Sequence, residues 1–447
     1  MSLFREILPW LIITLLLSIL LYHRASKPAA PKAEKKNSKR PWSLRPKTPD
    51  DCPDCAKRVT LRKVNPVPSA MPPPWETLKG PGGRKKTIET EGYACDDPDC
   101  RYYHIREARF HALAGNGVRG KTDAIQRLIC QACGNRFNVR RDTALHNLKT
   151  DPEHIELAMN LAAQGVGISV IARALGHSEE TIALWLARSG EHARLLHDHF
   201  FHDLELDYIQ VDELQTTIRQ WSQLKPGEKA WLWAAIDPIT RIIPVLAIGR
   251  RTTHDAMQFI HELVSRLAPG CVPLFTSDGR RQYFRAITAH FGKWVLLPGK
   301  RVQSWIIERR LQYGQLKKLK RGRKLEIRTR VLCGSRRDLR ETLKAMGFSG
   351  IINTSFIERF NLTFRQMVAA LARRTWFLAQ REDRLMLYLE WSRAWYHFVR
   401  FHQSLSLDEH LPRHLRGRTP AMAAGLTDHR WSTLDILKMP LAAAGGG

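Results

Sequence analysis

The chain has 447 residues, and its 71 lysines and arginines exceed its 43 aspartates and glutamates, which gives a formal net charge of +28. This length allows about three domains, and a hydrophobic content of 43% with 13 tryptophans excludes a wholly disordered chain. The excess of positive charge predicts a polyanionic partner, either nucleic acid or an anionic membrane face.

The first apolar run, residues 7–22, is borderline in length for a spanning helix of about 20 residues. Basic residues follow this run from Arg24 onward, and only Arg5 precedes it. This pattern does not fit a cleaved signal peptide. The positive-inside rule therefore predicts a cytoplasmic protein tethered by a single N-terminal helix. A mis-assigned start codon or an interfacial helix is the alternative.

Residues 24–91 are predicted to be a proline-rich, basic linker without apolar periodicity. The part from 24 to 86 holds 17 basic and 5 acidic residues. Cys52 and Cys55 lie within the linker and have the spacing of half a metal site, with no obvious second half. The sequence leaves open whether this pair binds metal.

Residues 92–150 contain two close cysteine pairs. Cys95 and Cys100 form the first, Cys130 and Cys133 the second, and 29 residues separate the pairs. Such pairs chelate a metal from one turn of the chain, so they favour tetrahedral coordination over disulfides and fit a reducing compartment. We therefore predict a zinc ribbon in which the four thiolates hold a structural Zn²⁺.

Residues 151–195 carry the pattern of a helix-turn-helix. Helices are predicted over 153–163, 168–175 and 178–188, and Gly176 ends the second. This pattern predicts a DNA-binding module.

The third helix of this module would present Ser178, Glu179, Thr181 and Arg188 to a DNA groove. Residues 151–193, however, hold six acidic and two basic residues, whereas DNA-reading modules are normally positive. Either neighbouring segments supply the charge, or the helices are only a packing unit.

After residue 200 the apolar pattern changes to that of a mixed α/β sheet. Strands are predicted over 206–211, 230–236, 242–248 and 272–276, and helices over 253–267 and 281–291. We therefore expect a multi-domain α/β protein with its core over 200–400 and a C-terminal tail over 401–447.

Three acids occupy informative positions in this core. Asp212 ends the first predicted strand, Asp278 follows the fourth, and Glu358 begins a long helix predicted by an apolar face over 357–371. Strand ends and a helix start can converge on one edge of a sheet. Clustered carboxylates repel one another unless divalent cations neutralise them, so the set suits a two-metal phosphoryl-transfer site.

An acid at a strand end is also a common solvated turn residue, which is how we interpret Asp237, while Asp255 reads as a helix-start acid. Glu213 should point away from Asp212 in a continuous strand. Arg365 lies seven residues beyond Glu358 on the same helical face, where a DNA phosphate could bind.

The blocks around the three acids resemble the catalytic blocks of bacterial insertion-sequence DDE transposases. The most similar type is the insertion-sequence-1 type, which has an N-terminal zinc finger and a helix-turn-helix before an RNase H-like core. The resemblance covers about residues 50–437. Its motifs are Val-Asp-Glu-Leu (211–214), Ser-Asp-Gly (277–279), Ile-Glu-Arg-Phe-Asn-Leu-Thr-Phe-Arg (357–365), and the stretches 396–405 and 418–426.

This resemblance implies that Asp212, Asp278 and Glu358 hold two Mg²⁺ (or Mn²⁺) ions. The enzyme would nick DNA at the element's ends and then use the 3′ hydroxyl to attack target DNA. Because two ends must be brought together, we expect at least a homodimer on DNA.

The N-terminal apolar segment and the basic stretch 300–344 depart from a compact transposase. The basic stretch has 16 basic and 4 acidic residues, and we interpret it as an inserted DNA-holding surface, with a solvated helical face as the alternative. The residues of the core assigned to DNA binding are Lys317, Lys318, Lys320, Arg321, Arg323, Arg359 and Arg365.

Two other functions remain open. One is a catalytically inactive, zinc-dependent DNA-binding protein derived from a transposase. The other is a nucleic-acid-binding scaffold associated with a membrane through residues 7–22. The presence of all three acids favours the active enzyme.

Overall fold

The computed structural model describes residues 72–78, 90–119, 125–221, 229–322, 324–373, 375–407 and 417–441. The apolar segment 7–22, the cysteines Cys52 and Cys55, and Arg323 lie outside these ranges. None of the helices in the described ranges combines the length and apolar character needed to cross a bilayer.

The first described module is a small antiparallel sheet that contains the four cysteines. Its strands follow the order β1 (Leu113–Arg119), β2 (Ile125–Cys130) and β3 (Arg136–Asn138). A short helix, α3 (Trp75–Leu78), precedes it in the chain. Leu113, Leu128 and three of the cysteines form its buried core. The core is small, so a cross-link through the cysteines would matter for its stability.

Three helices follow, as the sequence predicted: α4 (Pro152–Ala163), α5 (Ile168–Leu175) and α6 (Glu179–Phe200). Helix α5 ends at Gly176, whose φ of +68° is the left-handed conformation that favours glycine. Helix α6 begins where the Ser178 hydroxyl accepts a hydrogen bond from the Thr181 amide. The helix continues to residue 200, beyond the predicted end at 188, because its second half is buried against other helices.

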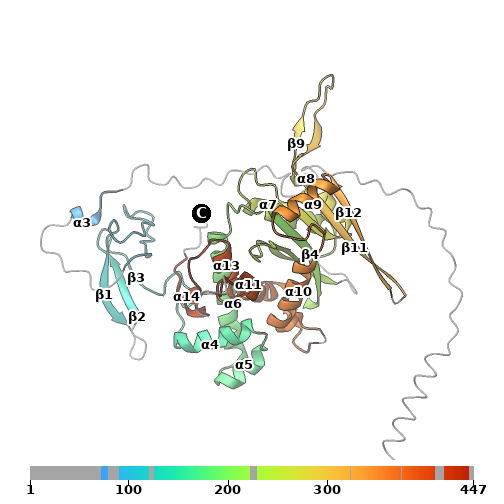
Figure 1. The fold of residues 1–447 in the computed structure, drawn as a ribbon. Helices are drawn as coiled ribbons and strands as arrows, with labels where there is room; N and C mark the ends of the chain where they lie inside the picture. The colour runs from blue at the N-terminus through green and yellow to red at the C-terminus, as the bar shows by residue number, and fades with distance from the viewer. Residues whose placement is uncertain are drawn as a thin grey trace, which may run out of the picture. The chain divides into compact units, whose positions relative to one another are not determined.

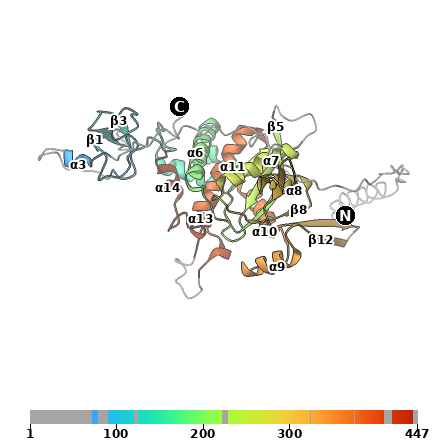
Figure 2. The same ribbon diagram turned by 90° about the horizontal axis from the view of Figure 1, so that it is seen from above.

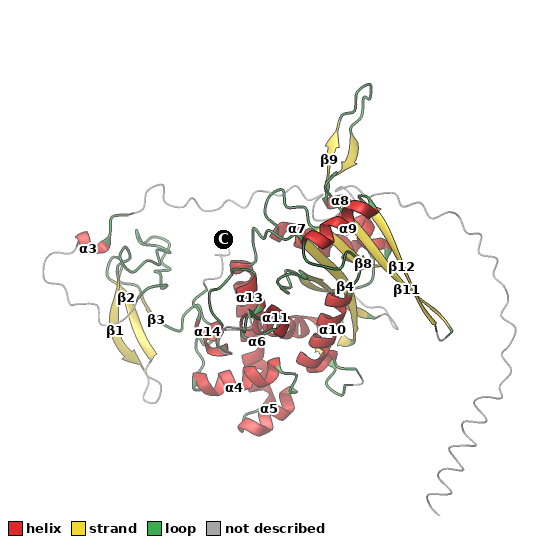
Figure 3. Cartoon of the chain, in the orientation of Figure 1, coloured by secondary structure: helices red, strands yellow, loops and turns green. Residues whose placement is uncertain are grey.

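The core is a six-stranded mixed sheet (Figure 3) in the order β12-β11-β8-β4-β6-β7. Strand β4 is antiparallel to β6 and parallel to β8, and β8 is parallel to β11. This arrangement is compatible with an RNase H-like core. The strands are β4 (Tyr208–Thr216), β6 (Ala230–Ile236), β7 (Leu246–Gly249), β8 (Leu274–Asp278), β11 (Tyr313–Arg321) and β12 (Lys324–Cys333).

Two strand predictions and the interpretation of the basic stretch need correction. The strand predicted over 206–211 runs on to Thr216, so Asp212 lies inside it and not at its end. The strand predicted over 242–248 begins only at Leu246. The basic stretch 300–344 is not merely an insertion, since it contains β11, a strand of the core sheet. The sequence pattern did not indicate this strand, because of its described residues only 313–316 are buried and the exposed Lys317 and Lys318 follow them.

Helices cover both faces of the sheet (Figures 1 and 2). On one face, Trp233 of β6 packs against α7 (Thr253–Arg266) and α8 (Arg281–His290) through Phe259 and Tyr283. On the other face, α10 (Ser355–Met367) lies against β4, and α6 packs against α11 (Glu382–Phe398). Double coverage explains why six of the seven residues of β6 are buried.

Smaller elements complete the described chain. A hairpin projects beyond the sheet in Figure 1, and helix α9 follows β12. The helix predicted over 357–371 stops at Met367 and is followed by a short 3-10 turn. These elements are β5 (Ile218–Gln220), β9 (Gly292–Val295), β10 (Ser304–Ile307), α9 (Arg336–Ala345), η2 (Ala369–Leu371), β13 (Ala379–Arg381), η3 (Gln403–Leu405), α13 (Pro420–Ala423) and α14 (Thr433–Lys438).

A buried polar chain joins α6 to α11. The Ile243 amide donates to His397 Nε2 at 2.9 Å, so the ring proton of neutral His397 lies on Nδ1, which donates to His197 Nε2 at 3.1 Å. His197 Nδ1 lies 3.2 Å from Glu390, which also accepts a 2.6 Å bond from Arg393. Burial lowers the pKa of His197 to about 4, so Arg393 and not His197 is the cation that balances Glu390.

Buried neutral histidines should make the fold acid-sensitive. Burial lowers the pKa of His192, His197 and His402 to about 4. Between pH 6.5 and 4 the unfolded chain therefore binds protons that the folded chain does not. Each histidine should then reduce the free energy of unfolding by about 1.4 kcal/mol per pH unit as the pH falls.

We predict that the urea concentration at the midpoint of unfolding, measured by tryptophan fluorescence, drops continuously from pH 7 to pH 5. The substitution His202→Gln is the control, because that side chain is 64% exposed, and it should leave the slope unchanged. A midpoint that is constant over this interval would contradict the assignment.

Candidate active site

Adjacent parallel strands carry Asp212 and Asp278. In the pairing of β4 with β8, Val211 lies opposite Ser277, so the two aspartates are one residue further along at the same level. One carboxylate oxygen each from Asp212, Glu213 and Asp278 lie within 4.8 Å of one another. The two aspartates predicted from the sequence are therefore brought together, and Glu213 joins them.

Asp212 faces helix α10. Its Oδ2 accepts a 2.9 Å hydrogen bond from Asn361 Nδ2, and the Oδ1 of that amide is buried without a hydrogen-bond partner in the described structure. Burial, together with the negative charges of Asp278, Glu213 and Glu358, raises the pKa of Asp212 to about 7. A carboxylate whose negative charge is destabilised in this way would be strongly stabilised by a nearby cation.

Alternation along β4 predicts that Glu213 points away from Asp212, yet one of its carboxylate oxygens lies within 4.8 Å of those of both aspartates. Its side chain is fully buried, 3.4 Å from Arg251 NH2 and 3.7 Å from Arg280 Nε. Arg280 also lies 3.5 Å from Asp278 Oδ2. Burial raises the pKa of Glu213, and Asp278 raises it further, against the two arginines. These arginines hold the acids in place, and the sequence alone did not identify them.

Glu358 lies in the first turn of α10, as predicted, but outside the 4.8 Å group of acids. Its Oε1 accepts hydrogen bonds from Lys318 Nζ at 2.5 Å and from Thr354 Oγ1 at 2.6 Å. Lys318 comes from β11 and was predicted to bind DNA phosphate. In this structure its ammonium group instead neutralises the third acid.

A cleft of about 540 Å³ opens beside the acids. It is polar and strongly charged, with both signs present at its walls. Cations there attract a phosphate backbone, and the acids attract divalent metal. The charged residues that line it are Asp278, Arg280, Arg281, Lys317, Lys318 and Glu358.

The other arginines and lysines assigned to DNA binding lie in different surroundings. Arg365 donates to the Leu371 carbonyl at 3.0 Å, so at least part of its guanidinium closes the end of α10. Arg359 is exposed and lines a second cleft. Lys320 and Arg321 belong to β11.

The residues assigned to groove contacts begin helix α6. The hydroxyls of Ser178 and Thr181 lie 3.1 Å apart at the helix start, and Ser178 is exposed. Arg188 is partly buried and donates to the His146 carbonyl. Arg188 thus has a structural contact, whereas Ser178 stays accessible.

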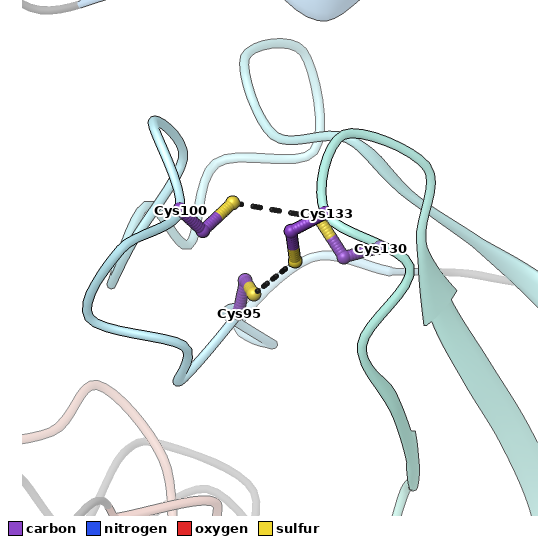
Figure 4. Close-up of side chains that lie close together, drawn as sticks. All are labelled: Cys95, Cys100, Cys130 and Cys133. Carbon is purple, nitrogen blue, oxygen red and sulfur yellow. Dashed lines mark hydrogen bonds between the residues drawn. The ribbon is translucent and has the colours of Figure 1, made fainter.

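The four predicted cysteines converge (Figure 4). Cys95 Sγ lies 3.5 Å from Cys133 Sγ, and Cys100 Sγ lies 3.7 Å from Cys130 Sγ. All four sulfurs are within 4.8 Å of one another, and all four cysteines are free. Disulfide sulfurs would be about 2.05 Å apart, whereas sulfurs around a tetrahedral metal at about 2.3 Å are roughly 3.8 Å apart. The arrangement therefore fits a tetrahedral metal.

Neighbouring groups support this fit. The Tyr102 amide donates to Cys100 Sγ at 3.4 Å, and Asn135 Nδ2 lies 3.8 Å from Cys95 Sγ. Such donors stabilise thiolates in metal sites. Burial is the main reason that the pKa of Cys100 rises to about 11, so a metal ion is needed for this thiol to be ionised at neutral pH. Cys271 and Cys333 lie outside this group.

No protein-family model matches the chain, and no curated protein matches it. Solved structures that are similar to parts of it include three Mos1 complexes. The Mos1 mariner paired-end complex with Mn has 12% identity, 31% coverage of this chain and 55% of that chain, and a TM-score of 0.14. The Mos1 paired-end complex with left transposon end has 15% identity, 32% coverage of this chain and 56% of that chain, and a TM-score of 0.13. A pre-cleavage Mos1 transpososome has 12% identity, 56% coverage of this chain and 80% of that chain, and a TM-score of 0.15.

The first two alignments thus span about half the length of the Mos1 chains. Because the TM-scores are this low, the function proposed below rests on the geometry of the site.

Replacing Lys318 should strengthen divalent metal binding. In Lys318→Met the ammonium group no longer competes for Glu358, and a partly exposed ion pair of this kind contributes up to about 1 kcal/mol. We expect the affinity for Mn²⁺, measured by electron paramagnetic resonance titration, to rise about two- to fivefold.

Lys317→Met is the matched control, because Lys317 lies next to Lys318 in the cleft but forms no ion pair with Glu358. An equal gain in both variants would show that general charge, and not the contact with Glu358, governs affinity.

Removing a cysteine ligand should unfold the small antiparallel sheet. We predict that the purified chain carries one tightly bound Zn²⁺, and that Cys130→Ser loses it and becomes sensitive to proteolysis between residues 90 and 150. Zinc content by mass spectrometry and limited proteolysis test this. Cys271→Ser should retain the metal, and full zinc content in Cys130→Ser would refute the site.

Proposed function

We propose that this chain is a DDE-type DNA transposase that cleaves DNA at the ends of an insertion sequence and joins them to target DNA. The observation that carries the proposal is the placement of three carboxylates from separate elements. Asp212 and Asp278 lie on adjacent parallel strands, and Glu358 on the helix packed against them, beside a cleft with basic walls.

The acids fit a divalent metal. They are hard oxygen donors, the pKa of Asp212 is raised, and nearby cations balance only part of their charge. Asp212, Asp278 and Glu358 would hold Mg²⁺ or Mn²⁺, which polarises the phosphate and lowers the pKa of a bound oxygen nucleophile. Asn361 orients Asp212, while Arg251 and Arg280 restrain Glu213.

The reaction consists of two transfers at phosphorus. A water oxygen bonds to the phosphorus at the element's end, and the bond from phosphorus to the 3′ oxygen breaks, leaving a 3′ hydroxyl. That hydroxyl then bonds to a phosphorus of target DNA and displaces its 3′ oxygen. Lys317 and Lys318 line the cleft and would bind the backbone phosphates.

The zinc ribbon and the helix-turn-helix would recognise the element's ends. Ser178 and Thr181 begin the third helix and are our candidates for groove contacts. We expect at least a dimer on DNA, since two ends must meet.

One observation favours a second function. Glu358 pairs with Lys318 and stands outside the group formed by the other acids. A chain in which this pair persists on DNA would be a catalytically inactive DNA-binding protein derived from a transposase.

Strand cleavage distinguishes the two functions. We would incubate the full chain and Mn²⁺ with DNA from the regions that flank its coding sequence, and map 3′ hydroxyl ends. Asp212→Asn, Asp278→Asn and Glu358→Gln should each reduce cleavage by roughly 100-fold or more. Glu341→Gln, an exposed acid on α9, is the control and should cleave normally. Cleavage that survives the substitution of any of the three would overturn the assignment.

A further inference from the structure

A second cleft, of about 610 Å³, follows another flank of helix α10. Thr354 and Glu358 line the cleft beside the acids, whereas Ser355, Phe356 and Arg359 line this one. Its far wall comes from residues 396–404, which the cleavage reaction does not use. We refer to this cavity as the arginine cleft.

Three arginines enter the arginine cleft: Arg241, Arg359 and Arg400. None of them forms an ion pair with an acidic side chain in the described part of the chain. The nearby Asp237 accepts hydrogen bonds from the Ile239 and Thr240 amides at 2.9 and 3.0 Å, and its charge acts on Arg241 without a direct ion pair. Arg359 and Arg400 have no acidic partner in the described part of the chain, and an anionic ligand would supply one.

Arg241 is held in position before any ligand binds. Its guanidinium lies 4.1 Å above the ring centre of Phe356, its Nε is 3.4 Å from Ser404 Oγ, and NH1 donates to the Pro238 carbonyl. Its backbone has a φ of +67°, which is uncommon for a residue other than glycine. A fixed, half-buried guanidinium that makes no direct ion pair with a carboxylate in the described structure is suited to binding phosphate.

The arginine cleft also offers an aromatic surface and a buried polar atom. Phe401 is 42% exposed, with the Arg430 guanidinium 4.3 Å over its ring. His402 Nε2 is buried without a hydrogen-bond partner in the described structure. Exposed rings beside unpaired arginines are typical of sites that bind single-stranded nucleic acid through both phosphate and base.

We propose that the arginine cleft binds one nucleotide of a DNA strand that flanks the cleavage position. Arg400 and Arg241 contact its phosphodiester, and its unstacked base lies on Phe401. The helix between the two clefts is about 10–12 Å wide, so the nucleotide lies roughly three positions from the cleaved bond at about 3.4 Å per nucleotide. This inference rests on the proposed action on DNA.

The test is binding of the full chain to fluorescent single-stranded and duplex DNA without divalent metal, followed by anisotropy over a range of salt concentrations. Arg400→Gln should lower the slope of log affinity against log salt by about 0.7 on single strands. Phe401→Leu should weaken single-strand binding by roughly tenfold and change duplex binding less.

Arg337→Gln is the matched control, because it removes one charge from an arginine that is 84% exposed on α9. Circular dichroism melting confirms that each variant is folded, and Phe401→Leu keeps the proposal testable if Arg400→Gln does not fold. Single-strand affinity and salt slope equal to those of Arg337→Gln in both variants would overturn the proposal. A second outcome would also overturn it. If inorganic phosphate raises the melting temperature of the wild type, and Arg400→Gln abolishes this stabilisation but leaves DNA binding unchanged, the cleft binds free phosphate and not DNA.

The outcome is separable from that of the cleavage assay, because binding is measured without metal and does not need the three acids. Loss of single-strand binding in a chain that never cleaves DNA would support the arginine cleft and refute the transposase. Normal cleavage together with unchanged single-strand binding in the variants would support the transposase and refute the arginine cleft.

Discussion

Electrostatic repulsion among closely spaced carboxylates is the constraint on which this structure depends. Asp212, Glu213 and Asp278 come within 4.8 Å of one another in the middle of a sheet. The fold offsets this repulsion with Arg251, Arg280 and the amide of Asn361, each supplied by a different element. The remaining negative charge faces the cleft, where a divalent cation would lower the free energy of the folded chain as well as enable chemistry.

The basic strand β11 connects substrate binding to this site. It is hydrogen-bonded to β8, which ends in Asp278, and it carries Lys317 and Lys318 into the cleft. Since Lys318 contacts Glu358, a phosphate that attracts Lys318 would free the third acid for metal. In the proposed function, therefore, DNA and metal would each favour the binding of the other through one lysine.

The sequence predicted much of this arrangement, and its failures have physical causes. Helices α4 and α5 followed from a proline start and a glycine end, and the two cysteine pairs from chelate spacing. Strand β11 was missed because of its described residues only the first four, 313–316, are buried, and the exposed Lys317 and Lys318 dominate the pattern that follows. Arg251 and Arg280 could not be assigned to Glu213, because their contact depends on how loops return to the sheet and not on local spacing.

The buried chain of His397, His197 and Glu390 has a consequence for modularity. It fastens α6, whose start carries the candidate groove contacts, to α11 of the α/β core. A module excised at the end of α6 would expose His197 and the apolar surface around it to water. Evolution or engineering can therefore exchange the exposed first turns of α6, but not the whole helix, without rebuilding α11. In the proposed function, recognition of new element ends would be acquired by point substitution at the helix tip rather than by recombination of domains.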